Sequence, residues 1–230
     1  MMEEARQTTN PIRLLMLAFD IREALEVALR KDPENLQVRL DLVRFHTTTP
    51  FIAGGQSDVA REQAAEIARR DAALGAFARG YMAYRAKEYG SARRELREAR
   101  RLARDGATRL LATKWLGWLS QETQQYDEAF ALFEELRASD ATGLYEIGRT
   151  AAFCSCELER GRAALQKYLT LPLDREMPGA ATAHYHLALV HEKRGDFVAA
   201  RREADAAWRL DRNVTGLKEL RTGWSAHQSG

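Results

Sequence analysis

The chain has 230 residues, and 35 lysines and arginines against 33 aspartates and glutamates leave it a net charge of +2. This balance does not favour a nucleic acid or an acidic membrane surface as the partner. The two cysteines exclude a disulfide framework. Because Cys154 and Cys156 stand two positions apart on a predicted helix, they point to different faces, and we expect no bridge between them.

The first predicted element is a helix that begins at Asn10-Pro11, a typical N-cap with proline in the first turn, and runs to about residue 31. Its longest apolar run, Leu14 to Phe19, is far too short for a membrane span. Acidic residues flank the run and no small-residue cleavage site follows, which does not fit a secretory signal. We expect a disordered tail over residues 1–10, no membrane insertion, and a cytoplasmic protein unless a processed N-terminus precedes this chain.

The next predicted helix pair, residues 36–72, carries an insertion. Its small residues stand seventeen positions apart instead of the twelve seen later, and the extra residues fall within 47–56. This segment contains Phe51, Ile52 and the pair Gly54-Gly55. A phosphate-binding loop needs several glycines and a Lys-Ser/Thr pair at fixed spacing. We therefore expect a flexible loop between helices, with both apolar side chains exposed.

Four further helix pairs follow at about residues 73–106, 110–143, 145–178 and 181–214, and they share one ladder of positions. The ladders are Gly80/Ala92/Leu96/Ala99, Gly117/Ala129/Phe133/Leu136, Ala152/Ala164/Tyr168/Leu171 and Ala188/Ala200/Ala204/Ala207. Their first residues lie 37, 35 and 36 positions apart (80→117→152→188). Such a period without strand signals is typical of a solenoid of helix pairs, whose backbones approach closely at the small residues.

The best match to a known family runs from Ala181 to Asn213. It contains His-Leu-Ala-Leu-Val-His-Glu-Lys-Arg-Gly-Asp-Phe, then Ala199-Ala200-Arg201, and closes at Leu210-Asp211. This segment resembles the tetratricopeptide repeat, although His184 and His191 replace the usual large aromatic residues and Arg212 replaces the usual proline. Asp32-Pro33 resembles the closing turn of an earlier repeat at about residues 11–35, so the resemblance covers about residues 20–214.

The resemblance implies an all-α fold, an α-α superhelix of about five helix-turn-helix repeats in one domain over residues 11–222. A short cap near residues 214–222 would close it, with a C-terminal tail at 223–230. In this family the first helix of each pair lines the concave surface, and one stripe of each helix would face the groove. The predicted groove residues are Phe77, Tyr81, Tyr84, Lys114, Trp118, Gln121, Arg149, Phe153 and Tyr185.

Exposed aromatic residues beside Arg and Lys are typical of binding hot spots. The stripe therefore predicts a non-enzymatic scaffold that holds a peptide or helix of a protein partner in the groove, with a guest that is hydrophobic and partly acidic. We expect Tyr81, Trp118 and Phe153 to be exposed. The alternative is that some of these rings pack against neighbouring helices. The sequence specifies neither the partner's identity nor the oligomeric state.

Two other functions stay open at this point. One is a regulator that contacts nucleic acid through an arginine-rich helix face, made of Arg93, Arg94, Arg97, Arg100, Arg101 and Arg104. Interspersed acidic residues make a solvated outer face the favoured interpretation of this run. The other is an enzyme with a site in the Thr47–Gln56 loop and the two cysteines, or an accessory subunit of an enzyme complex. His184, His186 and His191 do not have the i,i+3 or i,i+4 spacing of a helical metal site, so we expect no metal, no cofactor and no catalytic residue.

Overall fold

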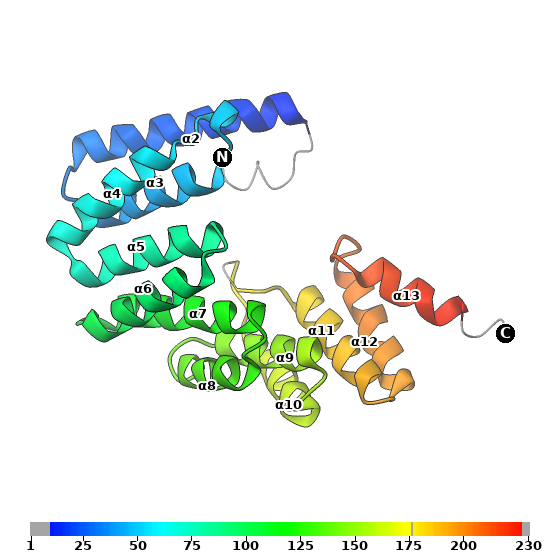
Figure 1. Cartoon of the computed structure of the whole chain (residues 1–230). Helices are drawn as coiled ribbons and strands as arrows, with labels where there is room; N and C mark the ends of the chain where they lie inside the picture. Colours follow the sequence, from blue (N-terminus) through cyan, green and yellow to red (C-terminus); the bar gives the residue numbers. More distant parts are fainter. Residues whose placement is uncertain (1–9, 176, 227–230) are drawn as a thin grey trace. The chain divides into compact units, whose positions relative to one another are not determined.

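The computed structural model describes residues 10–175 and 177–226, and this part of the chain contains helices and no strand. The predicted all-α fold is confirmed. The helices are labelled in Figure 1. They form two compact units, with unit 1 ending at Leu119 and unit 2 beginning at Ser120. The predicted tail residues 1–9 and 227–230 lie outside the described residues.

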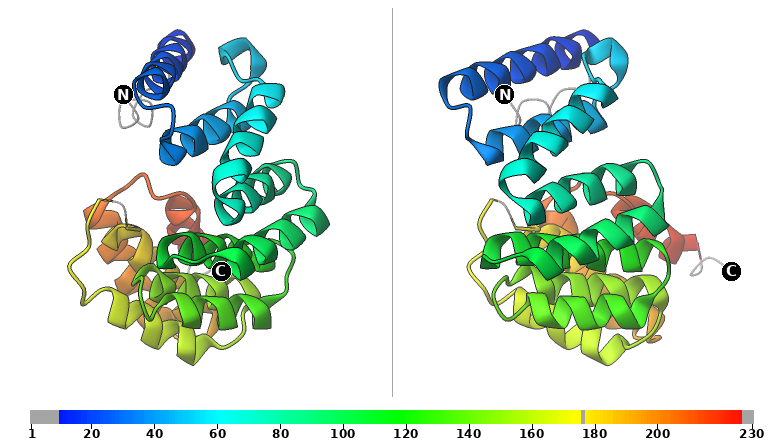
Figure 2. Two further views of the ribbon diagram at one scale, coloured as in Figure 1. Left: turned by 90° about the vertical axis from the view of Figure 1, so that its left-hand side faces the viewer. Right: turned by 60° about the vertical axis from the view of Figure 1, so that its left-hand side comes forward.

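Unit 1 begins with α2, a long leading helix that packs against α3, followed by two helix pairs, α3 with α4 and α5 with α6 (Figure 2). Asn10 caps α2, since its Oδ1 accepts hydrogen bonds from the amides of Ile12 at 3.0 Å and Arg13 at 3.3 Å. The predicted N-cap is therefore confirmed. The elements are α2 (Pro11–Lys31), α3 (Leu36–Thr48), η1 (Phe51–Ala53), α4 (Ser57–Arg70), α5 (Ala72–Arg85), α6 (Tyr89–Leu102) and α7 (Gly106–Glu122), within which the unit boundary falls.

Glycines in α5 allow the close helix contacts that the repeat ladder predicts. A Cβ atom on Gly80 would lie only 2.8 Å from Cγ of Leu96 on α6. On the other side of α5, a Cβ on Gly75 would lie 2.4 Å from Cα of Ala68 on α4. Any larger residue would push the helices apart, so the conformational penalty of glycine inside a helix is offset by packing.

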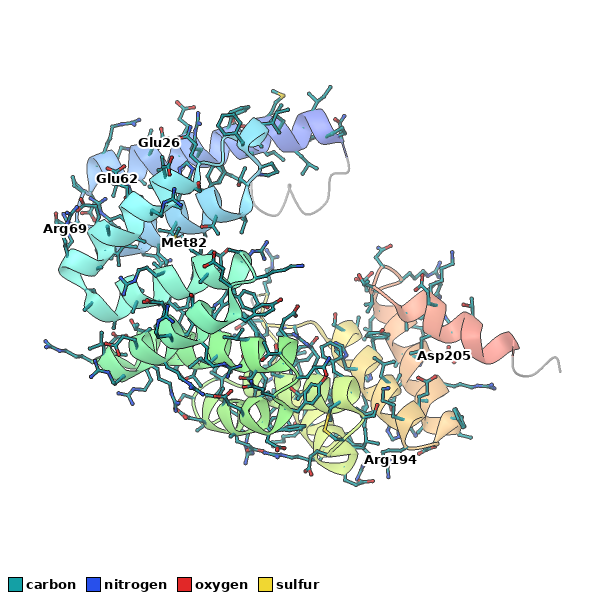
Figure 3. All side chains as sticks on the ribbon, viewed as in Figure 1. Glu26, Glu62, Arg69, Met82, Arg194 and Asp205 are labelled. Carbon is teal, nitrogen blue, oxygen red and sulfur yellow. A yellow bond between two sulfur atoms is a disulfide. The ribbon has the colours of Figure 1, made fainter. Side chains whose placement is uncertain are left out.

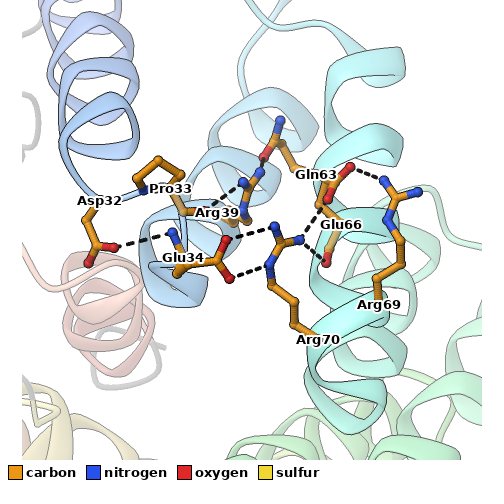
Figure 4. Close-up of polar contacts among 8 residues, drawn as sticks. All are labelled: Asp32, Pro33, Glu34, Arg39, Gln63, Glu66, Arg69 and Arg70. Carbon is orange, nitrogen blue, oxygen red and sulfur yellow. Dashed lines mark hydrogen bonds and ion pairs between the residues drawn. The ribbon is translucent and has the colours of Figure 1, made fainter.

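A polar network joins the turn between α2 and α3 to α4 (Figure 4). The buried guanidinium of Arg39 donates to Oε1 of Gln63 at 2.7 Å and to the carbonyl of Pro33 at 2.8 Å. Beside it, Nε of Arg70 donates to Oε2 of Glu34 at 2.8 Å. This exposed ion pair adds little to stability. The buried Arg39 bonds fix the turn more firmly, because their loss would leave a buried charge without partners.

The insertion forms a short 3-10 helix, η1, instead of an irregular loop. Phe51 is 84% exposed and Ile52 is 79% exposed, as the sequence predicts. Gly54 has a left-handed φ of 91°, and a Cβ on Gly55 would lie 1.7 Å from the carbonyl oxygen of Thr49. Both glycines therefore serve the sharp turn that leads into α4.

Unit 2 contains the pairs α9 with α10 and α11 with α12, and it ends in α13, which packs against α12 (Figure 1). α13 extends past the predicted cap into residues that the sequence assigns to the tail. The helices are α8 (Tyr126–Leu136), α9 (Thr142–Cys154), α10 (Leu158–Tyr168), α11 (Ala180–Lys193), α12 (Phe197–Leu210) and α13 (Leu217–Ala226).

Helices α11 and α12 pack against each other at the four alanines that the sequence predicts. These alanines have no exposed surface, and together with Leu217 they form one buried cluster: Ala188, Ala200, Ala204 and Ala207. Methyl groups at these positions let the two backbones approach while still covering apolar surface.

In the α9–α10 pair, the close contact lies one helical turn before the predicted one. The ladder places it at Ala152, but a Cβ on Gly148 would lie 2.2 Å from Cγ of Leu165, and a Cβ on Gly161 would lie 2.3 Å from Cβ of Ala151. Gly148 is thus the counterpart of Gly80. Arg149 directly follows Gly148, just as Tyr81 directly follows Gly80 in α5, so the two residues occupy equivalent positions on their helices.

Candidate functional site

Two of the predicted groove residues belong to the core of unit 1. Phe77 is fully buried and Tyr81 is only 5% exposed. The reason is Trp115 on α7, whose ring meets Tyr81 edge-on at a centroid distance of 4.9 Å and Phe77 at 6.3 Å. Burial also raises the pKa of the Tyr81 phenol. The expectation that Tyr81 is exposed is therefore wrong, because a ring from the next helix covers it.

Three further predicted residues lie half-buried around the same tryptophan: Tyr84, Lys114 and Trp118. The ring of Trp115 lies 5.3 Å from Tyr84 and 5.0 Å from Trp118, measured between centroids. Nζ of Lys114 lies 5.8 Å from the centroid of Trp118, a cation–π distance. The expected full exposure of Trp118 is not found, and a binding role for these three residues stays a prediction.

Three of the four predicted residues of unit 2 meet at a cavity of about 540 Å³. Arg149 and Phe153 reach it from α9, and Tyr185 reaches it from α11. The loop between α12 and α13 closes a further side. The other lining residues are Tyr145, Thr182, His186, Asp211, Asn213, Val214 and Thr215. Its volume lies in the range of ligand sites, and its lining combines aromatic rings with a similar share of polar groups.

His186 is the centre of this site, which we call the His186 pocket. Its ring lies 5.4 Å from Tyr145, 6.1 Å from Phe153 and 5.2 Å from Tyr185, between centroids. Burial, and then the charge of Arg149, lower the pKa of His186 to about 3, so the imidazole is neutral at physiological pH. Its Nδ1 has no hydrogen-bond partner among the described residues.

The sequence analysis considered His186 only as a possible metal ligand and missed this central position. The available signal was its place directly after Tyr185, on the edge of the predicted stripe. A neighbour of a groove residue can reach the same cavity when two helices supply the walls.

Hydrogen bonds hold Arg149 in one orientation. Its Nη2 donates to Oε1 of Gln121 at 2.9 Å, and its Nη1 lies 3.2 Å from Oε2 of the buried Glu146. Its Cζ lies 5.2 Å from the ring centroid of Phe153. Glu146 partly neutralises the charge of Arg149. The guanidinium is therefore a hydrogen-bond donor of fixed orientation that lies against the exposed ring of Phe153.

Gln121 is only 6% exposed, and its Nε2 donates to Oγ1 of Thr150. Gln121 was predicted to face the groove. The structure instead gives it a supporting position behind Arg149, because its amide is used by two neighbours. Phe153, at 52% exposed, is the most accessible ring of the pocket.

The two cysteines form a disulfide, contrary to expectation (Figure 3). Their Cα atoms lie 5.1 Å apart. The prediction assumed that the helix continues past both residues. α9 ends at Cys154 and Ser155 has a left-handed φ of 56°, so Cys156 turns back toward Cys154.

The other histidines of α11 are engaged with carboxylates. Nδ1 of His184 lies 2.7 Å from Oε2 of Glu203, and Nδ1 of His191 lies 3.4 Å from Oδ2 of Asp196. Across residues 10–175 and 177–226, His, Cys, Asp and Glu side chains form no group of three that could hold a metal ion.

The arginine-rich run lies on α6 except for Arg104, which follows the end of the helix, and acidic residues stand between its arginines. Arg101 pairs with Glu98 at 2.6 Å, and Glu95 pairs with Arg79 of α5 at 2.9 Å. The favoured interpretation of this run as a solvated outer face agrees with these pairs.

Comparison with known proteins supports the fold. No protein-family model matches the sequence, and no curated protein matches it. Among solved structures, YrrB, a TPR protein with an unusual peptide-binding site, is 14% identical, with a TM-score of 0.58 over 86% of this chain and 98% of its own. PilW, a type IV pilus biogenesis factor, is 16% identical, with a TM-score of 0.67 over 92% and 99%. MamA from Desulfovibrio magneticus RS-1 is 21% identical, with a TM-score of 0.57 over 77% and 97%.

These similarities confirm the resemblance at the level of the fold, which is that of the tetratricopeptide repeat proteins. In the part of the chain that the structure describes, no helix combines the length and apolar character needed to cross a bilayer.

Proposed function

We propose that this chain is a non-enzymatic protein-interaction scaffold that binds a peptide or helix of a protein partner at the His186 pocket. One observation carries the proposal. An exposed aromatic ring, Phe153, stands beside a guanidinium held by hydrogen bonds and opens onto a cavity around a neutral, buried imidazole. Aromatic rings with an adjacent arginine dominate the energetics of protein interfaces.

The lining predicts the chemistry of the guest. An apolar or aromatic side chain fits between Phe153 and Tyr185, where it would bury surface that is now exposed. A carboxylate or main-chain carbonyl of the guest would accept a hydrogen bond from Arg149. Asp211, on the loop side of the pocket, disfavours a second acidic group there. The favoured guest is therefore a hydrophobic segment with one acidic residue on its Arg149 side.

The orientation of Arg149 favours binding in a further way. Its hydrogen bonds to Gln121 and its contact with Glu146 are made before any guest arrives, so little side-chain entropy remains to be lost.

The fold comparison supports this proposal, while the site itself carries the argument for function. YrrB has the same fold and a peptide-binding site. In the arginine-rich run Arg101 pairs with Glu98, and on α11 His184 and His191 lie against carboxylates outside the pocket.

Site-specific photo-crosslinking tests the proposal. The full chain carries p-benzoylphenylalanine in place of Phe153 and is irradiated with a random-sequence peptide library. Phe197 is the matched control, because it is 54% exposed but does not line the pocket. We expect peptides to be captured at position 153 and not at position 197, with acidic and apolar residues enriched. Equal capture at both positions would contradict the proposal.

A second variant tests the role of the guanidinium. Arg149→Lys keeps the charge above Glu146 but loses the planar donor fork. We expect it to weaken capture at position 153 while the chain stays folded. Unchanged capture would show that Arg149 does not contact the guest.

A further inference from the structure

The turn between α9 and α10 differs from three other turns between paired helices. In each of those turns, one residue has a left-handed φ, and the next amide donates to a carbonyl five residues earlier. This is the hydrogen bond of a Schellman motif. The left-handed residues are Lys87, Gln124 and Gly195, and the hydrogen bonds join Glu88 to Ala83 at 2.9 Å, Gln125 to Ser120 at 2.7 Å and Asp196 to His191 at 2.9 Å.

The α9–α10 turn has no such hydrogen bond among the described residues. The Cys154–Cys156 disulfide closes it instead, and the amide of Cys156 donates to Sγ of Cys154 at 3.2 Å. Ser155 and Glu157, on either side of Cys156, both have positive φ, 56° and 50°. Residues with a Cβ seldom adopt this conformation, so the covalent ring holds a backbone shape that the other turns do not use.

This disulfide is poorly suited to stabilise the fold. A cross-link stabilises mainly by constraining the unfolded chain, and the effect grows with the length of the enclosed loop. Here the two cysteines are separated by Ser155 alone. Both cysteines are partly exposed, and their neighbours Ser155 and Glu157 are exposed, so the turn that carries the disulfide faces solvent, where a reductant can approach it.

We propose that Cys154 and Cys156 form a reversible redox site that exchanges with dithiols and whose two states place Phe153 differently. In the reduction, a thiolate of the dithiol attacks one sulfur of the pair, and the S–S bond breaks. The electron pair stays on the other cysteine, which takes up a proton. The second thiolate of the dithiol then attacks the mixed disulfide, releases the first cysteine, which is also protonated, and leaves the reductant as a cyclic disulfide. The chain gains two electrons and two protons.

Reduction removes the ring that holds the turn, and the turn is then free to close with the Schellman hydrogen bond of the other three. Phe153 directly precedes Cys154, and its ring contacts both Arg149 and His186. A change at the end of α9 therefore changes the wall of the His186 pocket. The consequence for peptide binding rests on the proposed function, while the redox site itself does not.

The test uses the full chain with dithiothreitol as the dithiol and its cyclic disulfide as the oxidant. Thiol labelling with mass spectrometry counts free cysteines, circular dichroism follows the fold, and ¹⁹F NMR follows 4-fluorophenylalanine placed at position 153. We expect both thiols to appear and disappear reversibly in a folded chain, with a different ¹⁹F resonance in each state. A Cys154→Ser/Cys156→Ser variant should show one resonance that dithiothreitol does not move.

Thiols that appear only when the chain unfolds would overturn the proposal, and so would an identical ¹⁹F resonance in both states. Peptides captured at the pocket then separate the two ideas. A change in their Kd of at least about fivefold between the two states would support control of the pocket. If both resonances appear but no peptide binds in either state, the proposed function fails and the redox site stands. If peptides bind clearly but with the same Kd in both states, the idea that the disulfide regulates the pocket fails and the proposed function stands.

Discussion

Each unit contains an aromatic cluster in which helices meet, and the two clusters differ at their centres. In unit 1 the centre is the large indole of Trp115, and the rings around it, Phe77 and Tyr81, are buried. In unit 2 the centre is the smaller imidazole of His186, and Phe153 beside it stays half exposed above a cavity. A similar set of rings thus makes a core in one unit and an open pocket in the other.

The two clusters also differ at one register position. The residue after the close-contact glycine is Tyr81 in α5 and Arg149 in α9. Tyr81 contributes a ring to the packed cluster, whereas Arg149 brings a charge that must stay near solvent and be paired with Glu146. The filled cluster stabilises its unit, and the open one leaves apolar surface available to a partner.

Truncating a ring of the closed cluster should give the largest effect. Phe77→Ala should lower the free energy of unfolding by about 3–5 kcal/mol, because it leaves a cavity in a fully packed core. Phe51→Ala, at an 84% exposed ring, is the control and should change it by less than about 0.5 kcal/mol. Urea denaturation measures both, and an equal small loss in the two variants would contradict the assignment of Phe77 to the core.

The pH dependence of stability should report on the centre of the open cluster. The pKa of His186 is about 3 in the folded chain and 6.5 when unfolded, so below pH 6.5 the unfolded state binds one more proton. The contribution of His186 is complete above pH 6.5 and is lost as the pH falls toward 3. Between pH 7.5 and 5 the loss should be roughly 2 kcal/mol.

A His186→Phe variant isolates this contribution from those of the carboxylates and of the other histidines. Urea midpoints at both pH values, for the wild type and the variant, give the difference. A variant whose stability falls as steeply as that of the wild type would show that the imidazole is not buried in neutral form.

Trp118 is intermediate in burial between Phe77 and Phe51, so its truncation should lower the free energy of unfolding less than that of Phe77 does. It is half-buried and meets Trp115 edge-on at 5.0 Å. Trp118→Ala should therefore cost about 1–2 kcal/mol, below the range for a fully buried ring. Thermal denaturation followed by circular dichroism measures this. Complete unfolding of the variant at room temperature would place Trp118 in the core with Phe77.

The helix pairs and two of their close contacts follow from the sequence, because small residues recur with the repeat and larger side chains do not fit where backbones approach. Gly80 and the alanines of the α11–α12 pair are examples. In α9 the ladder also contained Ala152, one turn after the true contact at Gly148, and two small residues on one helix cannot be ranked by spacing alone.

The pocket could be predicted only in part. Arg149, Phe153 and Tyr185 share the face that the periodicity indicates, and the structure brings them together. The burial of Tyr81 depends on a tryptophan contributed by the next helix, which a single-helix stripe does not reveal. The Cys154–Cys156 disulfide depends on where α9 ends, and the ends of helices are the least predictable feature of a sequence.

The most direct test of the open pocket measures stability and affinity on the same Phe153→Ala sample, with Phe197→Ala as the matched control. The two rings have nearly equal exposure, 52% and 54%, but only Phe153 lines the pocket. The free energy of unfolding of each variant should lie within about 1 kcal/mol of the wild-type value. For a peptide captured at position 153, Phe153→Ala should weaken binding by about 2 kcal/mol, or about thirtyfold in Kd, and Phe197→Ala should leave it unchanged. If Phe153→Ala binds the peptide as tightly as the wild type does, or if it unfolds, the pocket is not an exposed binding surface.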